Sequence, residues 1–273
     1  MNTTIKLLSL NVSLFDQNND KLTEFLKNNS FDIVCFQEVT RKVDNFALDS
    51  FITKDAIDKV VQQLNNSFYV PNMALKDFKQ NNFHGENVFK RDFKGVIEYG
   101  NYFKSRFEII EGKSIFLQEN FTYFTDWVQM ETHPGEEPRT VQVIDIKINN
   151  LQKLRILNYH GIWSKNKQGT SRTKVACQKI VQLASEASYP SIICGDFNLF
   201  PDTQSMQILK NSFRSLVDEF GIMSTRPKSN ELSKTKRNVV DYVFISKDIQ
   251  VKAFKAIDSD ASDHFPLVLE FKI

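Results

Sequence analysis

The hydrophobic residues fall into short apolar runs rich in β-branched side chains, separated in places by segments with helical spacing. The runs predict strands at residues 5–12, 32–36, 95–103, 107–117, 127–131, 141–148, 154–159, 191–194, 239–245, 251–256 and 265–271. The helical spacing predicts helices at 21–28, 55–64, 171–187 and 203–210, with Ser171 as the N-cap of the third. Residues 72–93 are polar and without a clear period, which predicts a long surface segment.

Strands and helices occur in both halves of the chain, and no low-complexity linker separates the halves. This order predicts two packed sheets flanked by helices, within a single domain over residues 1–273.

The composition, 41% hydrophobic and 25% charged, is that of a globular protein. With a formal net charge of +2, an anionic substrate has to be attracted by local groups and not by a global field. Cys35 and Cys194 lie in apolar runs, which predicts buried reduced thiols, and reduced thiols suit the cytoplasm. Because no signal-peptide pattern and no membrane-spanning run is visible, we expect a cytoplasmic protein without a membrane span.

The most informative motif is SIICGDFN at residues 191–198, where an apolar strand ends in Gly-Asp-Phe-Asn. Side chains two residues apart on a strand point the same way, so Asp196 and Asn198 should emerge on one side. A carboxylate that holds a metal or takes a proton, beside an amide that donates to a phosphoryl oxygen, suits a metal–phosphate site. The alternative is an Asx turn that only caps the strand.

An acid and an imidazole, Asp263 and His264, directly precede the last predicted strand. Asp241 lies among apolar residues in VVDYVFI, and a buried acid needs a partner. Pairing with His264 would orient the imidazole and favour its protonated form. The alternatives are a polar loop with an incidental histidine and an aspartate bonded to the backbone.

Three more polar residues, Asn11, Glu38 and His160, end predicted strands. Ligands of open α/β sheets bind at the carboxyl ends of strands. Polar residues end most strands, however, and a lone histidine is more often structural than catalytic.

The order of these motifs is more specific than any one of them: Asn11, Gln37-Glu38, Asn158-x-His160, Gly195-Asp196-Phe197-Asn198, Asp241-Tyr242 and Ser262-Asp263-His264. Together they resemble the endonuclease/exonuclease/phosphatase superfamily, which includes pancreatic deoxyribonuclease, neutral sphingomyelinases and deadenylases. The resemblance runs from Ile5 to Phe271 and implies a four-layer α/β sandwich of two mainly antiparallel or mixed sheets flanked by helices.

The resemblance also implies a divalent-metal site. Glu38, assisted by Asn11, would bind Mg²⁺ or Mn²⁺, which are hard cations that prefer oxygen ligands. Asp263 is a candidate for a further ligand.

It implies the following catalytic roles. Asp196 would orient or deprotonate the attacking water, and Asn198 would donate to a non-bridging oxygen. His264, supported by Asp241, would contact the phosphate in acid–base catalysis. His160 would stabilise the transition state or assist the leaving group.

Differences from the patterns of individual subfamilies indicate which branch of the superfamily the sequence resembles. The stretch around Asn158 and His160 differs from the tyrosine-bearing stretch of abasic-site endonucleases, which disfavours that branch. Leu199 follows GDFN where inositol polyphosphate 5-phosphatases have an arginine, which disfavours that branch too. The segment GDFNLFPDTQS resembles deadenylases and sphingomyelinases more closely.

Three residues are candidate substrate contacts. Residues 224–237 hold five basic residues and one acid, and within them we expect Arg226 to contact a phosphate or the leaving group. Trp163 would either stack on a base or pack on the neighbouring loop. Asn101 lies in YGNYFKSR, which resembles the family's Gly-Asn segment.

Three functions therefore remain open. The first is a phosphodiesterase or nuclease, which predicts a groove lined by the basic segment and Trp163, and salt-sensitive binding of nucleic acid. The second is a hydrolase of a small phosphate ester or phospholipid headgroup, which predicts a closed pocket or an apolar rim. A non-catalytic binding module ranks last, because every expected catalytic position holds a competent residue. No protein partner is evident.

Overall fold

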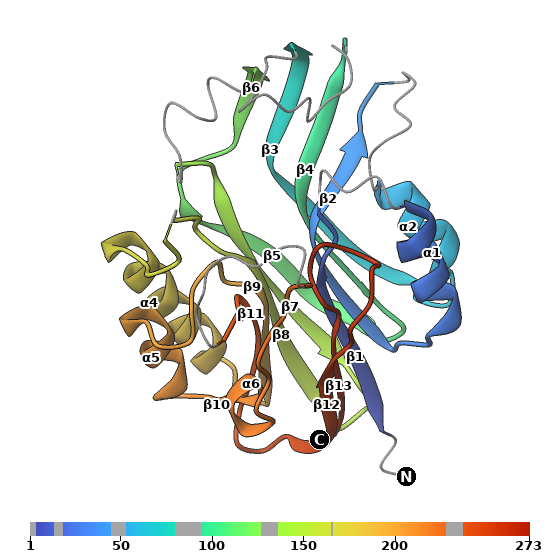
Figure 1. Cartoon of the computed structure of the whole chain (residues 1–273). Helices are drawn as coiled ribbons and strands as arrows, with labels where there is room; N and C mark the ends of the chain where they lie inside the picture. Colours follow the sequence, from blue (N-terminus) through green and yellow to red (C-terminus); the bar gives the residue numbers. More distant parts are fainter. Residues whose placement is uncertain are drawn as a thin grey trace.

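Two β-sheets pack face to face and carry helices on their outer faces (Figure 1). The computed structural model describes residues 4–13, 19–44, 53–79, 94–126, 136–164, 166–227 and 237–273. The strand predicted at 127–131 lies outside these residues. No helix within them has the length and apolar character needed to cross a membrane.

Seven strands form the first sheet, in the order β12-β13-β1-β2-β4-β3-β6. The pairs β1–β2 and β3–β6 are parallel and the others antiparallel. In chain order the strands are β1 (Ile5–Asn11), β2 (Ile33–Lys42), β3 (Asn66–Lys79), β4 (Val96–Ser105), β6 (Thr122–Asp126), β12 (Gln250–Ala256) and β13 (Leu267–Lys272). Helices α1 (Asn19–Asn28) and α2 (Lys54–Val60) cover the outer face (Figure 1).

Six strands form the second sheet, in the order β10-β11-β9-β8-β7-β5, with β8 and β9 parallel. The strands are β5 (Glu108–Gln118), β7 (Arg139–Lys147), β8 (Lys153–His160), β9 (Ser191–Asp196), β10 (Arg214–Ser215) and β11 (Asp241–Ile245). Helices α4 (Ser171–Ser185) and α5 (Gln204–Lys210) lie on its outer side, and α6 (Leu216–Glu219) contacts β11 (Figure 1). The four layers are those that the sequence predicts.

The strands nearest the middle are apolar on both faces, because each is buried between the other sheet and a helix layer. Successive side chains of a strand point to opposite faces. Leu7 of β1 accordingly packs between the sheets, whereas Leu8 and Leu10 pack with Leu22 and Leu26 of α1. Cys35 and Cys194 are free and buried, as expected, and so is Cys177 of α4.

A network of buried amide side chains crosses the space between the sheets. Gln37 donates to Asn158 Oδ1 (2.7 Å), Asn158 to Gln142 Oε1 (3.0 Å), and Gln142 to the carbonyl of Asn101 (2.8 Å). A satisfied buried hydrogen bond contributes about 1 kcal/mol, and an orphaned partner costs more than that. The network therefore fixes how the two sheets sit against each other.

Several predicted elements differ from the structure: β2 runs to Lys42 and not only to Phe36, and α2 ends at Val60 and not at Leu64. Two further differences have a clear physical cause. Residues 72–79 are not a surface segment but the end of β3, because pairing with β4 and β6 satisfies their backbone where local propensity is weak. The N-cap of α4 is Thr170 and not Ser171. Thr170 forms a capping box with Thr173, which satisfies two backbone donors at once.

Candidate active site

The predicted strand-end residues meet where the two sheets come together. Asn11, His160 and Asp196 are the last residues of β1, β8 and β9. Asp241 begins the antiparallel strand β11 directly opposite Asp196. β8 and β9 run parallel and β11 runs in the opposite direction. The last residues of β8 and β9 and the first residue of β11 therefore lie at the same edge of the sheet.

Asn11 joins two carboxylates through its amide group. Its Nδ2 donates to Glu38 Oε1 (3.0 Å) and to Asp196 Oδ2 (3.1 Å), while its Oδ1 accepts from the backbone N–H of Ser13 (2.9 Å). Glu38 has a φ of 63° and lies where the β2–β4 register shifts. Such a backbone conformation is costly for a residue other than glycine and clusters at functional sites.

Asp196 is the centre of the site. Its Oδ2 lies 3.8 Å from His264 Nε2 and 3.9 Å from His160 Nε2, and its Oδ1 accepts from the backbone N–H of Asn198 (2.8 Å). Burial by itself would raise the pKa of Asp196, but the positive charges of His264 and Lys167 hold it at about 2. The carboxylate is therefore an ionised acceptor. The Asx turn at GDFN is present as well, and it fixes the direction of Asp196.

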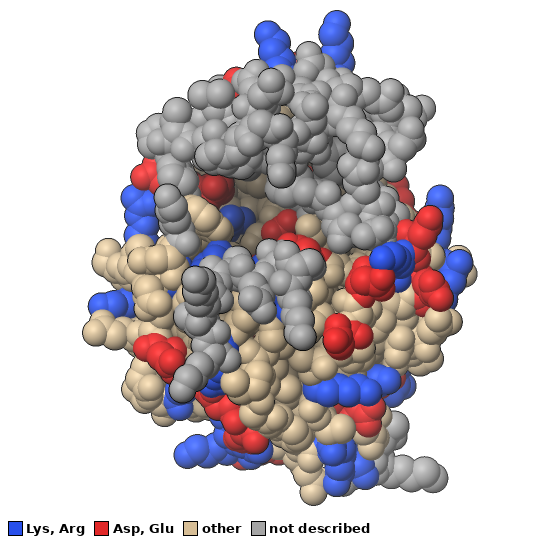
Figure 2. All heavy atoms as spheres, viewed as in Figure 1, with Lys and Arg blue, Asp and Glu red and all other residues tan. Residues whose placement is uncertain are grey.

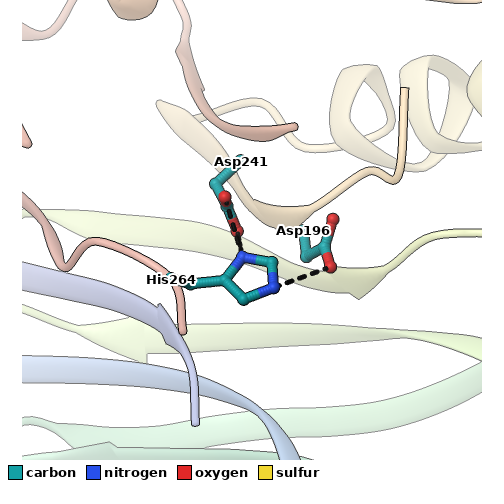
Figure 3. A group of neighbouring side chains, drawn as sticks. All are labelled: Asp196, Asp241 and His264. Carbon is teal, nitrogen blue, oxygen red and sulfur yellow. Dashed lines mark hydrogen bonds and ion pairs between the residues drawn. The ribbon is translucent and has the colours of Figure 1, made fainter. Parts of the chain in front are cut away.

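His264 stands between two carboxylates (Figure 3). Its Nδ1 lies 2.9 Å from both oxygens of Asp241, which is the predicted pairing. Burial tends to lower the pKa of His264, but the carboxylates of Asp241, Asp196 and Asp263 overcome this and raise it to about 9.

Arg226 contacts the other nitrogen of the same ring. Its Nη1 lies 2.7 Å from His264 Nε2, and its Nη2 donates to Asp263 (2.8 Å). The neighbouring Thr225 holds the segment in place, because its hydroxyl accepts from the backbone N–H of Asp241 (3.3 Å) and its carbonyl from that of Phe265 (2.7 Å). Arg226, the residue expected to contact a phosphate, therefore lies against the imidazole of His264.

His160 carries its proton on Nε2. Its Nδ1 faces Arg139 Nη1 (3.5 Å) and the Tyr99 hydroxyl (3.3 Å), and because a guanidinium only donates, Nδ1 accepts and Nε2 carries the proton. Nε2 points toward Glu38 Oε1 at 3.6 Å. Burial and the charge of Arg139 lower the pKa of His160 well below its usual value. His160 is therefore a neutral donor.

Lys167 is a site residue that the sequence does not reveal. It is buried (5% exposed) in the loop between β8 and α4, and its Nζ donates to Asn198 Oδ1. The ring of Trp163, with its centroid 5.1 Å from Nζ, lies beside it. A lysine in a polar loop is normally solvated, so nothing in the pattern distinguishes it. Arg139 and Tyr99 also contact His160, and no local pattern distinguishes them, because they come from other strands: Arg139 from β7, which pairs with β8, and Tyr99 from β4 of the other sheet.

Other predicted site residues lie away from the centre or have other partners. Asn101 is buried between the sheets and donates to the carbonyls of Thr140 and Asn158 (both 3.3 Å), so it is not placed to contact a substrate. Asp263 is the counter-ion of Arg226. Arg237 donates to Asp218 (2.8 Å), so this end of the basic segment does not line the site, and residues 228–236 lie outside the described chain.

Two groups of ligands are candidates for a metal ion. Asp196, Asp241 and His264 place ligand atoms within 4.8 Å of one another. Both oxygens of Asp241 are engaged by His264 Nδ1, which marks this group as a hydrogen-bonded relay. Glu38 provides carboxylate oxygens next to those of Asp196, and this pair of acids fits a hard divalent cation better, whereas Asn11 turns its Nδ2 toward both acids and its Oδ1 toward the Ser13 N–H.

The face of the molecule drawn in Figure 2 carries both signs of charge. It is hollowed near its middle, and acidic and basic atoms lie at the edge of the hollow. Local groups, and not the net charge, therefore set the electrostatics there.

A family model described as "Endonuclease/Exonuclease/phosphatase family" matches residues 8–264. Among curated proteins none matches the sequence. Solved structures share the fold at low identity. An endonuclease/exonuclease/phosphatase from Bacteroides vulgatus is 16% identical, with 99% of each chain covered and a TM-score of 0.65. The human Nocturnin catalytic domain with bound sulfate is 15% identical, with 98% of this chain and 93% of that chain covered and a TM-score of 0.62. A mannosyl-6-phosphatase from Bacteroides thetaiotaomicron is 16% identical, with 98% and 100% covered and a TM-score of 0.60.

Proposed function

Because the chain belongs to the endonuclease/exonuclease/phosphatase family, we propose that it hydrolyses a phosphate ester by in-line attack of water on phosphorus, with a divalent cation as cofactor. The observation that carries this proposal is the approach of His160 Nε2 and His264 Nε2 to the same carboxylate oxygen of Asp196, at 3.9 and 3.8 Å. These separations are too long for direct hydrogen bonds, and they suit side chains that all contact one atom of a bound substrate.

The reaction forms one phosphorus–oxygen bond and breaks another. Asp196, whose pKa is about 2, is a weak base, so its role is to accept a hydrogen bond from the attacking water and orient it. Asn198 Nδ2 and protonated His264 Nε2 donate to the non-bridging oxygens, where charge develops. His160 Nε2–H donates a hydrogen bond to the oxygen of the leaving group and keeps its proton. The proton that the attacking water loses balances the one that this oxygen gains, so that the leaving group departs as the alcohol.

Glu38 would hold the cation, with Asn11 beside it, and the Asn11 amide links the cation site to Asp196. Bound Mg²⁺ or Mn²⁺ would lower the pKa of water and offset the charge on the phosphoryl oxygens. The protein then needs no strong base of its own, which agrees with the low pKa of Asp196.

The test is an activity panel with Mg²⁺, Mn²⁺ or EDTA. The substrates are single- and double-stranded DNA, RNA, bis-p-nitrophenyl phosphate, p-nitrophenyl phosphate, inositol phosphates and sphingomyelin. Asp196→Asn should abolish turnover, while Asp202→Asn, an exposed aspartate six residues further on, should leave it unchanged. Turnover that persists in Asp196→Asn or in EDTA would refute the proposal.

Phosphodiesters, including nucleic acid, are the first substrate class that we propose. Trp163 supports it, because an aromatic ring beside the phosphate donors can stack on a base. A phosphomonoester is the second class. It is favoured by the buried cation Lys167, which matches the added charge of a terminal phosphate, and by the likeness to the mannosyl-6-phosphatase. The two p-nitrophenyl substrates separate these classes.

A further inference from the structure

The loop between β8 and α4 holds Lys167 in a fixed position. Its backbone N–H donates to the carbonyl of Ser164 (3.0 Å), and its carbonyl accepts from the N–H of Phe200 (2.9 Å), two residues after Asn198. Its φ of 56° is a conformation that residues other than glycine seldom adopt. The backbone thus ties this lysine to the segment that carries Asp196 and Asn198.

The charge of Lys167 lacks the compensation that other buried cations have. In the described chain four Lys and Arg residues are buried, and three of them form ion pairs: Lys104 with Asp58 (2.7 Å), Arg155 with Asp145 (2.7 Å) and Arg139 with Glu137 (3.7 Å). Within the described residues Lys167 forms no ion pair, and its ammonium contacts only the Asn198 amide oxygen and the face of Trp163. A buried charge without a counter-ion is costly. The burial of Lys167 accordingly lowers its pKa to about 8.

The Lys167 ammonium also determines how Asn198 is oriented. An ammonium only donates, so the amide oxygen must face it and Nδ2 is turned the other way, toward the Gly161 carbonyl at 3.4 Å. That contact is long, so Nδ2 is weakly held. Nδ2 and the remaining protons of Nζ form two neighbouring donors next to Asp196, which is an arrangement suited to an anion.

We propose that Lys167 is a phosphate-binding residue, whose ammonium donates to a non-bridging phosphoryl oxygen beside Asn198 and gains there the counter-ion that the protein does not supply. The proposal rests on the proposed function of this site. The competing explanation is that Lys167 only anchors the Asn198 amide and has no contact with the substrate.

Equilibrium binding of inorganic phosphate to the full chain tests the contact without turnover. Isothermal titration in the presence of Mg²⁺ would compare the wild type with Lys167→Gln, Lys167→Arg and Lys174→Met. Gln can still donate to Asn198 Oδ1 but carries no charge, Arg keeps the charge, and Lys174 is an exposed lysine on α4. We expect Lys167→Gln to weaken phosphate binding at least tenfold, which corresponds to about 1.4 kcal/mol. Lys167→Arg should bind more tightly than Lys167→Gln, and Lys174→Met as the wild type does.

Wild-type affinity in Lys167→Gln would overturn the proposal, because the charge would then be dispensable. Equal losses in Lys167→Gln and Lys167→Arg would also overturn it, since they would point to a requirement for shape and not for charge. Circular dichroism and thermal unfolding would confirm that each variant is folded.

Chemical rescue covers the case in which these variants are poorly folded. In Lys167→Ala, added ethylammonium should restore kcat/KM in a saturable way, whereas ethanol, which is similar in size and uncharged, should not. Absence of rescue in a folded Lys167→Ala, or equal rescue by both additives, would contradict the proposal.

The two proposals fail in different ways. If the wild type hydrolyses no ester on the panel but binds phosphate more tightly than Lys167→Gln does, the proposed function is wrong and the phosphate contact stands. If the wild type is active and Lys167→Gln retains the wild-type kcat/KM and phosphate affinity, the proposed function stands and the phosphate contact of Lys167 is wrong.

Discussion

Arg226 Nη1 lies 2.7 Å from His264 Nε2, and because a guanidinium only donates, the imidazole nitrogen accepts. In this arrangement His264 carries a single proton, on the Nδ1 that faces Asp241. The surrounding carboxylates nevertheless raise the pKa of His264 to about 9, so that protonation at neutral pH is favoured. A protonated Nε2 and Arg226 Nη1 would both be donors. Protonation of His264 therefore requires Arg226 to turn toward Asp263, which leaves Nε2–H available to a phosphoryl oxygen.

Replacing Asp241 with Asn should lower the pKa of His264. The carboxylate is the strongest of the groups that raise this pKa, so its removal leaves burial to act in the opposite direction. We expect the pKa of His264 to fall by more than about one, which corresponds to a loss of about 1.4 kcal/mol of interaction with the charged form of the ring. The activity that depends on protonated His264 should then be lost at a lower pH. The measurements are NMR titration of the His264 ring and kcat/KM between pH 5.5 and 10. An unchanged ring titration would contradict the assignment.

Replacing Arg226 with Met should change the pKa of His264 in the opposite direction. The guanidinium donates to the neutral form of the ring and its charge opposes a second proton, so its loss favours the imidazolium. The alkaline limb of the kcat/KM profile should move to higher pH, although substrate binding becomes weaker. The same NMR titration provides the measurement. A lower ring pKa in Arg226→Met would show that the contact with Nε2 does not exist in solution.

Replacing Glu38 with Gln should weaken the response to the metal. Gln keeps the size of the side chain but removes the charge that attracts a divalent cation. We expect the Mg²⁺ concentration for half-maximal activity to rise by about tenfold or more, the scale on which metal-site substitutions act. Glu24→Gln, at an exposed position of α1, serves as the control. A Mg²⁺ dependence that is the same in both variants would exclude Glu38 as a ligand.

Replacing Gly195 with Ala should destabilise the fold and remove the site with it. A Cβ at this position would lie 1.9 Å from the carbonyl oxygen of Tyr159 on the paired strand β8, and the φ of 136° disfavours any side chain. We expect a loss above about 3 kcal/mol, among the largest seen for single substitutions. At Gly221, with a φ of 61° and open space around it, Ala should cost only about 1 kcal/mol. Urea unfolding of both variants measures the difference, and similar losses would mean that β8 and β9 can separate to accept the methyl group.

Much of the fold was accessible from local pattern. The apolar runs place β1 and β9 within two residues of their observed ends, because strands buried on both faces are continuous in hydrophobicity. The pattern failed for β3, whose polar second half is held by its neighbours in the sheet. It also placed the cap of α4 one residue too late, since Ser171 and Thr170 are both good caps and only the contact with Thr173 separates them.

The sequence by itself determined which side chains end the strands, and so it identified Asn11, His160 and Asp196 as candidates for one site. Only the tertiary structure decided what each of them can do. The proton of His160 lies on Nε2 because Arg139, from another strand, faces Nδ1, and that of His264 lies on Nδ1 because Asp241 does. Lys167 belongs to the site because a loop returns to Asn198. Hydrophobic periodicity is a property of neighbours along the chain, whereas protonation, charge and donor direction depend on groups that meet only when the two sheets close.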